Sequence, residues 1–209
     1  ILSTINTILL LAILPETHKH INKVAKIAWS KSLSNIKKAA TSPGLRVIFV
    51  SMFLFTAGFT FFTTFFQGLL INKLGFKPNN VGDFFAYIGI WISATQAVLT
   101  PLLAKKFKNY QLLRISFIGL GLALFAQLLA TNTTQLLLVA PFIAIFNGIT
   151  FANATSLISM SASPKNQGEV LGIDASVQAL GQAIPAIIAG YVATFGIAAP
   201  VVVGGATII

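Results

Sequence analysis

The chain has 209 residues, of which 56% are hydrophobic and 9% are charged, and its mean hydropathy is +0.85. Soluble domains carry about a quarter charged residues, so this composition excludes an ordinary water-soluble domain, and the lack of cysteine excludes disulfide frameworks and thiolate metal sites. The net charge of +10 comes from basic clusters between apolar runs, which is typical of a membrane protein and not of a nucleic-acid groove.

The first two segments are predicted to be the end of a membrane helix and a basic connection. Residues 1–14 are apolar but too short to cross a bilayer. Residues 15–43 are a cytoplasmic inter-domain loop in which apolar side chains recur at helical spacing. Both an amphipathic helix on the inner leaflet and a solvated linker fit this pattern. The segment holds half of the twelve lysines: Lys19, Lys23, Lys26, Lys31, Lys37 and Lys38.

A transmembrane domain is predicted for residues 44–209. Apolar runs of spanning length recur between breaks rich in proline, glycine and asparagine. Backbone groups inside lipid must be paired within their own segment, so each run is predicted to be an α-helix. Both chain ends are apolar and the chain lacks an initial methionine, so we expect a piece cut inside a helix at each end. The spans lie at about 46–70, 82–104, 112–130, 136–160, 168–193 and, incomplete, 197–209.

The basic residues predict which side of the membrane each loop occupies. Twelve lysines and arginines fall on one side of the predicted spans, and only Lys73 and Lys77 fall on the other. Loops rich in lysine and arginine remain in the cytoplasm. We therefore expect a multi-pass protein of the plasma (cytoplasmic) membrane, of the bacterial inner-membrane type, embedded in the lipid bilayer.

Three sequence features carry a resemblance to a known family. Half a span ending in Leu14-Pro15-Glu16-Thr17, then a long basic loop and alternating spans, resembles the major facilitator superfamily entered at the end of its sixth helix. The segment Leu103–Tyr110 is similar to the second copy of that family's cytoplasmic loop motif, with Lys105 where the family has an aspartate. The stretch Pro164–Gly172, followed by Gly181, Pro185 and Gly190, resembles the eleventh helix of tetracycline-resistance-type drug:proton antiporters.

The resemblance implies an all-α membrane helix bundle: the C-terminal six-helix half of a major-facilitator fold, with two inverted three-helix repeats. It implies alternating access against an N-terminal six-helix half of the same protein, with proton-coupled efflux of a drug-like or amphipathic small molecule. The coupling acid is then expected in that other half. Uptake or export of a sugar or another metabolite is an alternative, and a non-transporting membrane sensor or assembly subunit is a second one.

The span at 46–70 carries the main candidates for a substrate cavity. Thr56, Thr60, Thr63 and Gln67 share one helical face, beside a stripe formed by Phe55, Phe59, Phe62 and Phe66. Hydroxyls and an amide bordered by rings suit a large, partly apolar substrate. The alternative is that the rings face lipid and the threonines bond their own backbone.

Other polar and aromatic residues within spans extend this list, because polar groups in lipid usually face a cavity or another helix. Tyr87 and Trp91 share a face and suit either ring stacking with a ligand or plain helix packing. Asn147 and Asn153 do not share a face, so one is expected to point to substrate and the other to bond a neighbouring helix. Gln178 completes the cavity candidates.

Gating or helix-interface roles are predicted for seven residues. Asp174 lies with Gln178 and Gln182 along one side of its span, and suits either a gate or a titrating acid. The glycines permit close helix approach and the proline permits a kink. Lys105 and Lys106 lie in the cytoplasmic loop motif. The set is Lys105, Lys106, Gly172, Asp174, Gly181, Pro185 and Gly190.

No enzyme is predicted, because no nucleophile–base–acid set is visible and no catalytic residue is assigned. The sequence shows no phosphate-binding glycine loop, and no cofactor or metal is expected. His18 and His20 lack further ligands nearby.

Overall fold

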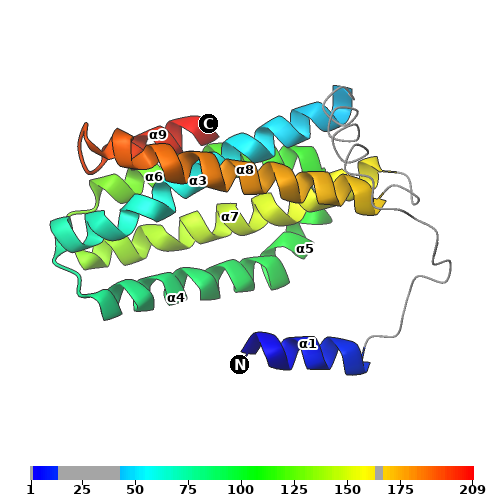
Figure 1. Ribbon diagram of the computed structural model, residues 1–209, viewed down its shortest axis with the longest axis horizontal. Coiled ribbons are helices and arrows are strands. Elements are labelled where there is room, and N and C mark those ends of the chain that lie inside the picture. Colours follow the sequence, from blue (N-terminus) through cyan, green and yellow to red (C-terminus); the bar gives the residue numbers. More distant parts are fainter. Residues whose placement is uncertain (1, 14–42, 163–166) are drawn as a thin grey trace. The chain divides into compact units, whose positions relative to one another are not determined.

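The computed structural model describes residues 2–13, 43–162 and 167–209, and in these ranges all regular structure is helical (Figure 1). The all-α prediction is therefore confirmed. The basic connection of residues 15–43, apart from Pro43, and residues 164–166 of the antiporter-like motif lie outside the described residues. The elements are α1 (Leu2–Ile13), α3 (Pro43–Leu74), α4 (Pro78–Ala94), η1 (Thr95–Leu99), α5 (Thr100–Ala104), α6 (Asn109–Leu129), α7 (Thr133–Ser161), α8 (Gln167–Ala193) and α9 (Ala199–Ile208).

Five helices are long and apolar enough to cross a membrane. They are α3, the continuous rod formed by α4, η1 and α5, and the helices α6, α7 and α8. The helix α9 is also apolar but has only 10 residues. These helices confirm the prediction of a multi-pass membrane bundle.

Local sequence signals fix where two of these helices end and begin. At the end of α3, Gly75 has φ of +65°, its N–H donates to Ile71 O, and the Phe76 N–H donates to Leu70 O. The Gly75 bond to Ile71 O is the single hydrogen bond that closes a helix ended by a left-handed glycine. At the start of α7, Asn132 Oδ1 accepts a hydrogen bond from the Gln135 N–H at 2.9 Å, which caps the helix.

The order in which the helices pack is the one expected of two repeats. The helix α3 packs against α8 and α9, α7 packs against α4 and α6, and α6 packs against α9 (Figure 1). The first triplet (α3, α4–α5, α6) can be matched helix by helix to the second (α7, α8, α9). The α3–α8 contact then corresponds to α7–α4, the α3–α9 contact corresponds to α7–α6, and the α6–α9 contact corresponds to itself. Inverted three-helix repeats predict this relation between neighbours.

The phenylalanine stripe of α3 forms part of the buried core. Phe55, Phe62 and Phe66 are each at most 1% exposed. The Phe55 ring lies 5.2 Å from the Phe151 ring of α7, in an edge-on arrangement, and the Phe66 ring lies 5.7 Å from the Phe84 ring of α4. The alternative of a lipid-facing stripe is therefore wrong for these three residues, whose rings tie α3 to its neighbours.

The rod that contains α4 and α5 is interrupted by a wider π-helical turn, η1. Pro101 has no N–H to bond the carbonyl of the preceding turn, and the Thr100 N–H reaches back five residues to Thr95 O. Thr95 is buried and packs against Gly148 of α7, where an added Cβ would lie 3.2 Å from the threonine methyl. The π-turn therefore lies at the contact between α4 and α7.

Candidate functional site

A cavity of about 340 Å³ lies between α3, α7 and α8. Its α3 wall contains three of the predicted threonines, which lie at helical spacing and therefore on one face. Its lining combines aromatic rings, hydroxyls and an amide, which is the mixed character of sites for partly apolar ligands. The lining residues are Phe55, Thr56, Phe59, Thr60, Thr63, Phe151 and Gln182.

The three threonine hydroxyls are also bonded to the backbone of their own helix. Thr56 donates to Met52 O at 2.7 Å, and Thr60 donates to Thr56 O at 2.8 Å. Thr63 donates to Thr60 O over a longer 3.3 Å. The threonines therefore line the cavity and also bond the backbone of their own helix. Each hydroxyl proton is donated within α3, and the oxygen lone pairs can still accept hydrogen bonds from a ligand.

The glutamine that lines the cavity is Gln182 and not the predicted Gln67. Gln67 is exposed and lies outside the cavity lining, one turn beyond Thr63 along α3. Gln182 of α8 supplies the amide of the cavity instead. Sequence reasoning placed Gln182 on the polar side of its span but did not assign it to the cavity. The missing information was which helix lies opposite the threonines.

Tyr87 and Trp91 lie together on α4, as predicted from their spacing. Their rings are 6.3 Å apart and nearly perpendicular, and the Tyr87 hydroxyl donates to Leu137 O of α7 at 3.3 Å. Tyr87 also lines a separate pocket of about 290 Å³ together with Asp83. Trp91 is exposed and lines neither pocket. The structure thus favours helix packing for Tyr87.

Both predicted asparagines of α7 are buried. Asn153 Nδ2 donates to Ile149 O at 2.8 Å, so it bonds its own helix and not a neighbouring one as expected. Asn147 Nδ2 has no hydrogen-bond partner among the described residues. The same is true of both amide atoms of Gln127 in α6, a fully buried side chain that sequence reasoning missed. The only sequence signal for Gln127 was that an amide side chain stood among apolar residues of a predicted span.

The polar side of α8 contains a buried carboxyl group. Asp174 is only 4% exposed, and the Gln178 amide nitrogen donates to its Oδ2 at 2.7 Å. Asp174 Oδ1 has no hydrogen-bond partner in the described part of the chain. Gln178 therefore contacts the acid and does not line the 340 Å³ cavity.

Within the described residues, Gly181 is the one predicted interface glycine that meets another helix. A Cβ at Gly181 would collide with Thr56 of α3, whereas a Cβ at Gly172 or Gly190 would meet nothing within 4 Å. No described helix approaches Gly172 or Gly190 closely, and their interface role stays a prediction. The spacing of nine residues is the physical reason, because it equals two and a half helical turns and places Gly181 opposite the other two. Pro185 is buried on the side of Gly181, inside the continuous helix.

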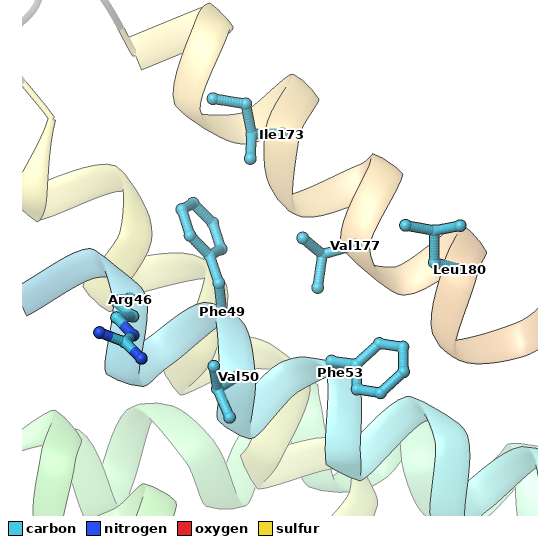
Figure 2. Close-up of a pocket in the computed structure, with 7 residues that line it drawn as sticks. All are labelled: Arg46, Phe49, Val50, Phe53, Ile173, Val177 and Leu180. Atoms are coloured by element: carbon cyan, nitrogen blue, oxygen red, sulfur yellow. The ribbon is translucent and has the colours of Figure 1, made fainter. Parts of the chain in front are cut away.

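A second, apolar pocket lies between α3 and α8, as Figure 2 shows. Its volume is about 250 Å³, and Arg46 lies at the end where α3 begins. It is lined by Arg46, Phe49, Val50, Phe53, Ile173, Val177 and Leu180.

The two candidate gating lysines lie in the loop between α5 and α6. Lys105 and Lys106 are both exposed and close no pocket in the described residues. The described residues also contain no group of three or more metal-ligating side chains.

Comparison with known proteins gives two findings. A family model described as Major Facilitator Superfamily matches residues 1–186. The hippocampus abundant transcript 1 proteins of Mus musculus and Homo sapiens are each 22% identical to the chain over 191 residues. These matches cover 86% of this chain but 37% of the relatives, so the chain spans little more than a third of their length.

Proposed function

The chain belongs to the major facilitator superfamily, and from this membership we propose that it contributes to proton-coupled efflux of a drug-like or amphipathic small molecule. Family membership supports membrane transport by this fold. In the proposal, the described bundle rocks against an N-terminal six-helix half of the same protein, and protons moving inward drive the substrate out. The proposal places the protein in the plasma membrane, of the bacterial inner-membrane type, and the lysine and arginine asymmetry supports an orientation with the basic loops in the cytoplasm.

The single observation that carries the substrate class is the lining of the 340 Å³ cavity. Three of its seven lining residues are phenylalanines, and the polar remainder is three threonines and one glutamine. Rings can stack on the apolar part of a ligand, while hydroxyl and amide groups orient its polar part. A volume of this size lies in the range of sites for drug-sized molecules.

A sugar or a similar metabolite is the second candidate. Recognition of such a ligand needs hydrogen-bonding groups around most of its surface, because each polar group buried without a partner costs free energy. The cavity offers a single amide and threonine hydroxyls whose protons are already donated to the backbone. This composition favours the amphipathic ligand.

Transport by the intact, full-length protein in proteoliposomes tests the proposal. With an imposed pH gradient, tetracycline or a lipophilic cationic dye should be moved against the direction of proton flow. Dissipating the gradient with a protonophore should abolish the movement. Transport of small hydrophilic solutes alone would reject the efflux proposal, and absence of all transport in correctly folded protein would favour a sensor or assembly subunit.

A further inference from the structure

Asp174 is the buried acid of the described chain, since Asp83 and Glu169 are both exposed. It lies on the second turn of α8, roughly 10 Å from the helix start at 1.5 Å per residue. Its Oδ2 accepts the hydrogen bond from Gln178, and its Oδ1 is left without a partner in the described residues. One of the two oxygens of this carboxyl group is therefore unpartnered among the described residues.

The helices around Asp174 supply little charge to balance an ionised carboxylate. α8 packs against α3, α7 and α9, and neither α7 nor α9 contains an ionisable side chain. α3 contains Arg46 and Lys73. Lys73 lies at the opposite end of α3, where its Nζ donates to Leu128 O at 2.7 Å. Arg46 is exposed and lines the apolar pocket beside Ile173.

Asp174 has the features of an acid on a proton pathway. Acidic side chains inside membrane spans pair with one another or with other polar groups, or mark proton relays. Among the described residues no cation pairs with Asp174, and its Oδ1 has no hydrogen-bond partner. A proton can therefore bind at Oδ1 while the Gln178 bond to Oδ2 is kept.

Asp174 and the cavity lie along the same side of α8, with Gln178 and Gln182 at successive turns. Gln178 and Gln182 follow it at steps of four residues, so the three lie on one side of α8, one turn apart. Gln178 bonds the acid, and Gln182 lines the cavity. Between them, Gly181 packs against Thr56, another lining residue. A change in the cavity can thus reach Asp174 through two helical turns.

We propose that Asp174 is a proton-binding site whose occupancy is linked, through Gln178 and Gln182, to substrate in the cavity; this rests on the proposed function. In the release step the O–H bond at Oδ1 breaks, its electron pair stays on the carboxylate, and the proton passes to water on the side then open. Rebinding from the other side restores the neutral acid. The chain described here thus holds a coupling acid of its own, apart from any in the other half.

Infrared titration of the purified full-length protein tests proton binding without requiring transport. Asp174→Asn removes the carboxyl group while keeping its size, and Glu169→Gln removes an exposed acid of the same helix as a matched control. We expect one carboxylic acid band that titrates in the wild type and in Glu169→Gln and is lost in Asp174→Asn. An unchanged band in Asp174→Asn would overturn the proposal. So would an Asp174 band that never titrates while the protein stays folded, because the acid would then be purely structural.

Transport in proteoliposomes tests the link to the cavity, with tetracycline as the probe. Asp174→Asn should lose stimulation by a pH gradient but retain tetracycline counterflow, which needs no net proton movement. Glu169→Gln should retain both. Full stimulation in Asp174→Asn would overturn the inference and leave the proposed function intact. A wild type that no pH gradient stimulates would overturn the proposed function, while the infrared titration still decides whether Asp174 binds a proton.

A variant that preserves the carboxyl group covers the case in which Asp174→Asn does not fold. Asp174→Glu lengthens the side chain by one methylene and moves the acid relative to Gln178. We expect proton-stimulated tetracycline transport with a displaced pH profile. A pH profile identical to that of the wild type would count against Asp174 as the titrating group.

Discussion

Gly181 of α8 packs directly against Thr56 of α3, so closely that a Cβ on the glycine would collide with the Thr56 hydroxyl oxygen. Thr56 is itself 4% exposed and donates its proton to Met52 O. The contact joins a cavity-lining residue to the helix that carries Asp174. Movement of α8 relative to α3 is therefore constrained at the edge of the cavity.

Replacing Gly181 with alanine should destabilise the bundle. The new methyl group must displace Thr56 or push the two helices apart, which typically costs about 1–3 kcal/mol. We expect a lower unfolding temperature for Gly181→Ala in detergent, measured on the full-length protein by intrinsic fluorescence. Gly172→Ala is the matched control, because its Cβ would meet nothing within 4 Å. Equal stability of the two variants would contradict the packing described.

A buried hydroxyl pair links α6 to α7 and should contribute little to stability. Thr150 Oγ1 lies 2.8 Å from Ser116 Oγ, and both residues are fully buried. Each hydroxyl also has an acceptor in its own helix, Phe146 O for Thr150 and Leu113 O for Ser116. Loss of one partner therefore leaves no unmet donor.

The double-mutant cycle of Thr150→Val and Ser116→Ala measures this link. We expect a coupling free energy of about 0.6 kcal/mol, which is the average for hydrogen bonds between membrane helices. Reversible unfolding in mixed micelles of detergent and sodium dodecyl sulfate gives the four stabilities. A coupling of several kcal/mol would mean that the backbone acceptors do not compensate.

The general fold was predictable because lipid imposes simple rules on sequence. An apolar run of sufficient length must be a helix, and basic residues mark its cytoplasmic end. The five long helices follow from these rules. The π-turn at Thr95–Leu99 did not follow from them. Pro101 was not recognised as a site of irregularity, and the packing of Thr95 on Gly148 is a tertiary contact that local sequence does not encode.

The site was predictable on one helix and not across helices. Helical spacing gives the angle of a side chain about its own axis, which correctly groups Thr56, Thr60 and Thr63. It does not say how far along the axis a neighbouring helix remains in contact. Gln67 therefore lies on the predicted face of α3 but one turn beyond the part of that face that lines the cavity. Gln182 can be assigned to the cavity only from the packing of α8 against α3.

The continuous helix formed by α4, η1 and α5 determines on which side of the membrane the segments before and after it lie. It runs over 27 residues from Pro78 to Ala104, roughly 40 Å at 1.5 Å per residue, which is enough to cross a bilayer. Lys73 precedes this rod and Lys106 follows it, and both are exposed. The two lysines should therefore lie on opposite sides of the membrane, with Lys106 in the cytoplasm.

Labelling of single cysteines checks this arrangement. The chain has no cysteine of its own, so Lys73→Cys and Lys106→Cys can be compared in a full-length background cleared of any others. A membrane-impermeant maleimide should label Lys73→Cys in intact cells. It should label Lys106→Cys only after the membrane is permeabilised. Labelling of both from the same side would mean that this rod does not span the bilayer.

Gln182 and Gln67 provide a direct comparison for the cavity, because both are exposed glutamines and only one lines it. Gln182→Ala removes the amide that can hydrogen-bond the polar part of a ligand. One such bond is worth about 0.5–1.5 kcal/mol, so tetracycline affinity should fall by roughly two- to tenfold. Gln67→Ala should leave affinity unchanged. Tryptophan fluorescence quenching in the full-length protein measures both. If Gln67→Ala weakened binding and Gln182→Ala did not, the ligand would occupy the next turn of α3 and not the cavity between α3, α7 and α8.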